Sequence, residues 1–138
     1  MQVNQKISEG LALLASIDPI SQGAGTVTTG WIAVANLHQL MAVVSTGVMG
    51  ASATLDAKIQ QAQDGVGTGA KDVTGKAIAQ IVKASGDNKQ ALINFRAADV
   101  DTNNGFGYVR LSMTVGTAAS LIAGYLYGAT RFEDAALF

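Results

Sequence analysis

Three oxygen-bearing side chains stand at alternate positions in one polar stretch: Asp99, Asp101 and Asn103. Calcium-binding loops begin with this spacing, because a hard cation takes six or more oxygen ligands. The rest of such a loop is missing, since the glycine comes late, at Gly105, and Arg110 stands where a bidentate Glu is needed. An Asx-rich turn between two strands explains the same residues. We keep the three side chains as metal-ligand candidates beside that simpler interpretation.

A glycine-rich stretch from Gly65 to Lys71 looks faintly like a phosphate-binding loop. The P-loop spacing is not met, because Gly75-Lys76 is followed by Ala77 and the first glycine position holds Ala70. The stretch also lacks a strand-to-helix setting. We therefore expect an exposed hairpin loop.

His38 is the only histidine, and the chain has no cysteine. A metal site at His38 would need carboxylates from elsewhere in the chain, because none lies between Asp18 and Asp56. No nucleophile-elbow motif accompanies the histidine. We expect a partly buried or interface histidine, no enzymatic activity and no cofactor.

Four aromatic side chains could form a platform that stacks on sugar rings: Trp31, Tyr108, Tyr125 and Tyr127. Aromatic residues are more common in cores and interfaces, where their large apolar area is buried. A carbohydrate- or calcium-binding module therefore stays as an alternative function.

The composition points to burial rather than to charge-driven binding. The chain has 138 residues, 49% of them hydrophobic, and a formal net charge of −1. This charge gives no electrostatic reason to expect nucleic acid or a lipid surface as a partner. No charged side chain lies between Asp18 and Asp56. So uncharged a segment must be buried in its own core or against a partner.

Residues 111–130 carry no charge and contain Gly124-x-x-x-Gly128, a spacing that lets membrane helices approach one another. Serine, threonine and glycine residues lower the hydrophobicity of this run. Its first part also alternates with period two, which a spanning helix does not need. We expect no membrane span here.

The clearest strand signal follows the Asn104-Gly105 turn. Apolar residues alternate with polar ones from Tyr108 to Val115, as in a half-buried strand. The alternation places Val109, Leu111, Met113 and Val115 on one face. A similar strand is expected over residues 90–97, with Ala91, Ile93, Phe95 and Ala97 facing inward.

Other segments are read as strands from β-propensity and spacing. Residues 53–62 fit a helix or a strand, and we choose strand because a sheet needs partners for its edges. Residues 2–16 fit a helix or a short strand, which Asp18-Pro19 should stop. Further strands are expected at residues 26–29, at 31–37 and 38–48 with a bend between them, and at 77–82, where one short helix also fits.

Strand signals recur about every eight to twelve residues, separated by Gly, Asn, Asp and Ser. This spacing predicts an all-β fold, a jelly-roll-like β-sandwich of about seven or eight strands with an irregular or short helical N-terminal segment. We expect one domain over residues 1–138. Within it, residues 1–25 form an N-terminal arm or segment and residues 131–138 a C-terminal tail.

Residues 121–127 are apolar at both odd and even positions. Such a strand is buried on two sides, so it should be central in a sheet or lie at a subunit contact. Together with the uncharged first third, this pattern indicates a protein that assembles with other chains. The interface candidates are Trp31, Leu121, Tyr125, Tyr127 and Phe138.

Three groups of segments carry a resemblance to a known class of proteins: 30–38, 53–62 followed by 67–72, and 90–96 followed by 105–115. In residue types and in their order along the chain, over about residues 30–130, they resemble small structural proteins of tailed bacteriophages. The likeness rests on no active-site motif, so it assigns no functional residue.

The resemblance implies a virion component, most like a capsid decoration (cement) protein. Such a protein is a small β-sandwich that binds the capsid exterior and holds neighbouring capsomers together. The implied partners are the major capsid protein and further copies of this chain, for example in a trimer, without nucleic acid or membrane. The implied location is the virion surface, after synthesis in the cytoplasm of a bacterial host. A head–tail or tail-associated virion protein remains the alternative.

Overall fold

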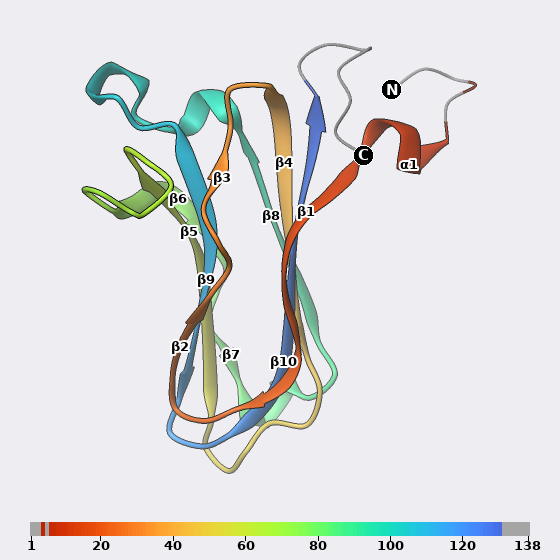
Figure 1. The fold of residues 1–138 in the computed structure, drawn as a ribbon. Coiled ribbons are helices and arrows are strands. Elements are labelled where there is room, and N and C mark those ends of the chain that lie inside the picture. The colour runs from red at the N-terminus through yellow and green to blue at the C-terminus, as the bar shows by residue number, and fades with distance from the viewer. Residues whose placement is uncertain (1–3, 5, 131–138) are drawn as a thin grey trace.

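The computed structural model describes residue 4 and residues 6–130, which form two antiparallel sheets packed face to face (Figure 1). Sheet A has the order β1 (Ala12–Gln22), β10 (Ser120–Thr130), β4 (Leu37–Thr46) and β8 (Gln90–Arg96). Sheet B has the order β2 (Gly25–Thr28), β9 (Tyr108–Gly116), β5 (Thr54–Ala62) and β6 (Lys71–Ala77). The short strands β3 (Ile32–Ala33) and β7 (Ile81–Val82) pair with β9 and β5. The helices are single turns: α1 (Ile7–Gly10), α2 (Lys83–Gly86), η1 (Ala97–Asp99) and η2 (Thr102–Asn104).

This strand order is that of a jelly roll, in which eight strands form two four-stranded sheets. Neighbours within each sheet come from distant parts of the chain. The first strand, β1, lies beside the last, β10, and β4 lies between β10 and β8. The predicted all-β sandwich is therefore confirmed, with β3 and β7 added to the eight principal strands.

The core fills the space between the two sheets, as period-two patterning requires. The predicted inward face of β9 is confirmed, because Val109, Leu111, Met113 and Val115 are at most 1% exposed. Strand β5 is also confirmed as a strand rather than a helix, and its inward residues Leu55 and Ile59 are fully buried.

Strand β10 lies between β1 and β4, so its predicted central position is confirmed. Gly124 and Gly128 both point into the sandwich. A Cβ atom at Gly124 would lie 2.7 Å from the Met113 sulfur, and one at Gly128 would lie 2.6 Å from Leu14 Cδ1. The glycine spacing thus lets β10 lie close to its neighbours in the core. Within the described part of the chain, no helix has the length and apolar character to cross a membrane.

The N-terminal segment departs from the expectation. Asp18-Pro19 does not stop the first element, because β1 continues through both residues to Gln22. The pairing with β10 shifts register between Ile17 and Ile20, and β1 is an edge strand. A bulge on an edge strand is a position where proline is tolerated, since no partner needs its missing N–H group. Residues 12–22 of the expected arm are thus part of sheet A.

Two further differences concern sheet B. The predicted strand over residues 31–37 is reduced to the two residues of β3, which pairs with β9, whereas β4 lies in sheet A. Strand β6 was not predicted, because Lys71, Asp72, Gly75 and Lys76 have low β-propensity and only Val73 is buried. Of the predicted strand or helix at residues 77–82, only Ile81 and Val82 form a separate strand, β7, which leads into α2, while Ala77 ends β6.

Candidate interaction surface

The outer face of sheet B is polar, and its side chains bond to one another. Lys58 forms an ion pair with Asp72 at 3.1 Å. Arg110 Nε donates to Gln60 Oε1 at 2.9 Å, and Gln80 Nε2 donates to Asp56 at 2.9 Å. This face therefore has the character of an ordinary solvated surface.

The outer face of sheet A is different, because apolar side chains run across all four strands. The register places Tyr125 beside Val43, and Val43 beside Leu92. In the next row, Leu13 lies beside Tyr127, and Tyr127 beside Met41. We call this surface the sheet A face; its residues are Leu13, Met41, Val43, Leu92, Leu121, Ala123, Tyr125 and Tyr127.

None of these eight side chains is charged, and their nearest polar neighbours on the same face include Ser, Gln and Asn residues. The charged residues of the sheet A strands are Asp18 on β1 and Arg96 on β8, and both are exposed. Three leucines are exposed: Leu13 to 55%, Leu92 to 58% and Leu121 to 46%. The ring centroids of Tyr125 and Tyr127 lie 6.4 Å apart, and the angle between the ring planes is 40°. An apolar surface that spans a whole sheet is unusual in a protein that acts alone.

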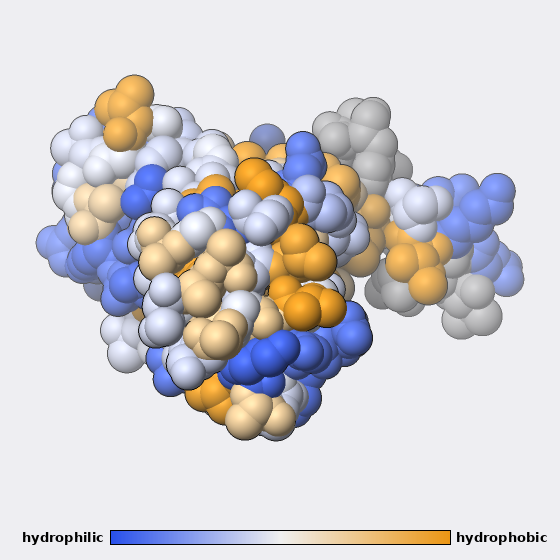
Figure 2. Space-filling model, turned by 90° about the horizontal axis from the view of Figure 1, so that it is seen from below, coloured by the Kyte–Doolittle hydropathy of each residue, from blue (hydrophilic) through white to orange (hydrophobic). Residues whose placement is uncertain are grey.

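A hollow of about 450 Å³ continues the sheet A face at the end where β10 begins. The view from below shows hydrophobic side chains gathered at this end beside a group of hydrophilic ones (Figure 2). The hollow can admit a side chain from a partner. Its lining includes Pro19, Ile20, Ser45, Gly47, Leu121 and Tyr125.

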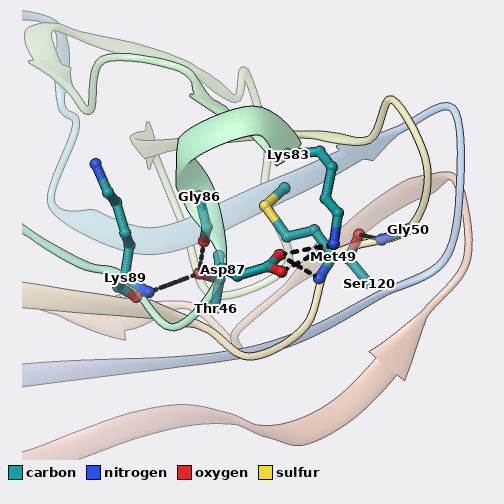
Figure 3. Close-up of polar contacts among 8 residues, drawn as sticks. All are labelled: Thr46, Met49, Gly50, Lys83, Gly86, Asp87, Lys89 and Ser120. Carbon is teal, nitrogen blue, oxygen red and sulfur yellow. Dashed lines mark hydrogen bonds and ion pairs between the residues drawn. The ribbon is translucent and has the colours of Figure 1, made fainter.

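A polar network joins the loops at this end of sheet A, and it includes Thr46, which also lines the hollow (Figure 3). Thr46, at the end of β4, donates through its hydroxyl to the Gly86 carbonyl and accepts from the Lys89 N–H at 3.0 Å. Asp87 accepts from the Met49 N–H at 2.9 Å and from Lys83 Nζ at 2.8 Å. The Lys83 hydrogen bond, followed by that of the Met49 N–H, lowers the pKa of Asp87.

Two of the metal-ligand candidates, Asp99 and Asp101, bond to different partners. Asp99 accepts from the Arg96 N–H at 2.7 Å and lies 3.7 Å from Lys76 Nζ. Asp101 accepts from Lys71 Nζ at 2.7 Å, and this bond is the largest cause of its lowered pKa. Asn103 lies exposed in η2. Within the described residues, no three His, Cys, Asp or Glu side chains are grouped to hold a metal ion.

The glycine-rich stretch forms the exposed loop between β5 and β6, as predicted. Two of its backbone N–H groups already have an anionic partner. The Asp64 carboxylate accepts from the N–H groups of Val66 and Thr68, each at 3.0 Å, and from the Thr68 hydroxyl. The Thr68 side chain is the largest cause of the lowered Asp64 pKa. These hydrogen bonds engage two backbone N–H groups and one hydroxyl that could otherwise bind a phosphate.

The four aromatic candidates lie on two different surfaces. Trp31 lies with sheet B, where the Arg110 guanidinium stacks 4.4 Å from its ring centre. Tyr108 is near the β5–β6 loop, since a Cβ atom at Gly65 would lie 3.7 Å from its ring. Tyr125 and Tyr127 lie on the sheet A face with Leu121. A single sugar platform is therefore not assembled, and Phe138 lies outside the described residues.

His38 is exposed on β4, so of the two expectations for it the partly buried position is wrong, whereas the interface position stays a prediction. The sequence-based reasoning also missed several residues of the sheet A face, chiefly Leu92, Val43 and Leu13. A signal for two of them was present, because Ala91-Leu92-Ile93 and Ala42-Val43-Val44 are apolar at consecutive positions. Consecutive apolar residues in a strand indicate two apolar faces.

None of the protein-family models matches this sequence, and none of the curated proteins does. One similar solved chain comes from infectious bursal disease virus Gx strain, with a TM-score of 0.48 and 17% identity over 87% of this chain. The present chain spans only 32% of that one. Another comes from Bacillus endospore appendages described as disulfide-linked pili, with a TM-score of 0.35 and 16% identity. That match covers 94% of this chain and 98% of the other.

Proposed function

We propose that this protein is a non-enzymatic structural component of a virion that assembles through the sheet A face. The observation that carries the proposal is the contrast between the two outer faces. The sheet B face is polar and internally bonded, whereas the sheet A face is uncharged and apolar across four strands. A protein that acts by surface burial needs one such face and no catalytic group.

The exposed leucines give the scale of the binding energy. Burying a leucine side chain completely contributes about 1.5–3 kcal/mol. Leu13, Leu92 and Leu121 are each about half exposed, so each contributes about 1 kcal/mol when a partner covers it. Three such contacts correspond to an affinity gain of roughly a hundredfold, before the tyrosines are counted.

Within this class, a capsid decoration protein of a tailed bacteriophage fits best. The resemblance over residues 30–130 supports this role, and so does the jelly-roll topology, which viral capsid domains also use. In this role, the sheet A face binds the capsid exterior or another copy in an oligomer. A head–tail or tail-associated position would use the same surface.

The experiment is co-expression with the major capsid protein encoded in the same genome, followed by sedimentation of the assembled heads. A decoration protein is expected in the head fraction, in a fixed ratio to the capsid protein. Heads that assemble and sediment without this protein would contradict the decoration role. Its recovery with purified tails from the same phage would instead assign it to the tail.

A further inference from the structure

Strand β8 is an edge strand of sheet A that lacks the usual protection against pairing with another strand. Proteins protect sheet edges with charged residues, prolines, bulges or very short strands. The other edges of the sandwich have such features: β1 contains Asp18, Pro19 and register shifts, β2 has four residues, and β6 is rich in charged residues. By contrast, β8 has no charged residue before Arg96, and it pairs with β4 along its whole length without a register shift.

The backbone of β8 alternates between groups that bond to β4 and groups that face away from it. The Thr46 N–H donates to the Lys89 carbonyl at 2.8 Å. This bond fixes the alternation, because bonded pairs recur at every second residue of an antiparallel ladder. The residues whose N–H and C=O groups face away from β4 are Gln90, Leu92, Asn94 and Arg96.

Side chains meet two of these outward groups. The Asn94 carbonyl accepts from Lys76 Nζ at 3.2 Å, and the Arg96 N–H donates to Asp99 Oδ2 at 2.7 Å. Within the described part of the chain, no group bonds to the outward N–H and C=O of Gln90 or Leu92. The first half of β8 therefore offers open donors and acceptors to another strand.

We propose that β8 pairs with β8 of a second copy of this chain, antiparallel and about a two-fold axis at Leu92. In this register Leu92 bonds to Leu92 of the second copy, and Gln90 of each copy lies opposite Asn94 of the other. The Asn94 carbonyl can accept a second bond beside that of Lys76, since it has two lone pairs. A register centred one residue later would place Gln90 opposite Arg96, whose N–H is already bonded to Asp99.

Charge complementarity at both ends of the paired segment favours a second copy as the partner. The Asp99 carboxylate lies at the free edge, because it accepts from the outward Arg96 N–H. Lys89 is exposed, and among the described residues no carboxylate lies within 4.0 Å of its Nζ atom. In the proposed register Lys89 of one copy lies opposite Phe95 of the other, next to Arg96, so its long side chain reaches Asp99. The two-fold axis repeats this ion pair at the other end.

The pairing also joins the apolar surfaces of the two copies. Leu92 is 58% exposed, and on its other side the row continues through Val43 to Tyr125. Leu92 of the second copy extends this row into one sheet of two copies. Because contact is made at the edge, the sheet A face stays open to a different partner. The inference thus goes beyond the proposed virion function and does not depend on it.

The absence of cysteine from the sequence makes disulfide trapping between copies a direct test. In the full-length variant Leu92→Cys, the two Cα atoms should lie about 5.5 Å apart across the axis. A disulfide needs Cα atoms about 4.4–6.8 Å apart. The control Asn94→Cys is exposed on the same face of β8, but its two Cα atoms should lie about 14 Å apart. We expect Leu92→Cys to form disulfide-linked dimers at least about tenfold faster than Asn94→Cys.

A mixture of two variants tests the register. Separately purified Gln90→Cys and Asn94→Cys should each stay largely unlinked, whereas their mixture should give a disulfide between one copy of each. Charge reversal tests the ends of the contact. Lys89→Glu should weaken self-association severalfold, because it faces Asp99 with a like charge. Lys6→Glu is the matched control, since it makes the same charge change ahead of β1, the opposite edge strand of sheet A.

Non-reducing electrophoresis measures the disulfides, and sedimentation velocity of the cysteine-free chain measures self-association. Equal oxidation rates for Leu92→Cys and Asn94→Cys would overturn the proposal, and so would a chain that sediments as a monomer at every concentration. Equal effects of Lys89→Glu and Lys6→Glu would overturn the register. A monomeric chain that still sediments with assembled heads would refute the β8 pairing alone and leave the proposed virion function standing.

Discussion

At the scale of single residues, Gly124 shows how closely the two sheets approach. It lies in the middle of β10 with its hydrogen atoms facing the core. A Cβ atom there would lie 2.7 Å from the Met113 sulfur and 2.8 Å from Leu111 Cδ2, both of them fully buried side chains. Glycine is needed at this position because the facing core side chains leave no room.

We therefore expect Gly124→Ala to lower the free energy of unfolding by about 1–3 kcal/mol. The loss should lie near the lower end of this range, because the flexible ends of the neighbouring side chains can shift. Gly124→Arg should prevent folding, since it places a charge between the sheets. Urea denaturation measures both. Gly23→Ala is the matched control, because no atom lies within 4 Å of its Cβ position. Equal effects of the two alanine variants would contradict the packing at Gly124.

Asp87 links stability to pH. Its pKa in the folded protein is lowered from 3.8, first by the Lys83 hydrogen bond and then by that of the Met49 N–H. A lowered folded-state pKa contributes stability that is complete above the unfolded pKa and is lost as the pH falls through the folded value. Asp87→Asn should therefore lower the urea midpoint at pH 6 and change it much less near pH 2. If Asp87→Asn lowered the urea midpoint by the same amount at pH 6 and near pH 2, this linkage would be contradicted.

At the scale of elements, sequence patterns predict the strands in which each face keeps the same environment along its whole length. Strand β9 has one buried and one polar face, and its alternation identifies it directly. Strand β10 has apolar residues on both faces, and its central position follows from that. Strand β5 could be assigned only by assuming a sheet, because its residues also fit a helix.

Other elements depend on contacts that no local pattern records. Strand β6 is rich in Lys, Asp and Gly, and it forms because β5 offers it an edge. Pro19 lies within β1 because a bulge on an edge strand accommodates it. The sheet A face was predicted only in part, since Leu92 appeared to be on a solvent side. Its place beside Val43 and Tyr125 becomes visible only once β8, β4 and β10 are adjacent.

Thr46 illustrates how one side chain joins elements far apart in sequence. Its hydroxyl connects the end of β4 to the Gly86 carbonyl and the Lys89 N–H, and the residue is 3% exposed. Thr46→Val leaves these groups without a side-chain partner, so we expect a loss of about 1–3 kcal/mol in the free energy of unfolding. Thr74→Val, on exposed β6, should change it by less than about 0.5 kcal/mol. Thermal or urea unfolding that shows similar losses for both variants would refute the role of the hydroxyl.

At the scale of the whole molecule, the sandwich has two unlike outer surfaces. Sheet B presents bonded polar side chains, and sheet A presents the apolar sheet A face, which a hollow continues at the end where β10 begins. The jelly roll makes this division possible, because each sheet has its own outward set of alternating residues. A molecule built in this way is suited to lie between a partner surface and solvent.

The central claim is that the sheet A face holds the protein in an assembly. The most direct measurement is the amount of protein that sediments with heads, compared between Leu92→Lys and the matched control Val66→Lys. Val66 is an exposed apolar residue in the β5–β6 loop, away from the sheet A face. Both variants should fold, and Leu92→Lys should bind at least about tenfold more weakly, because a charge in an apolar contact costs more than about 1.4 kcal/mol. Undiminished binding of Leu92→Lys would contradict the account.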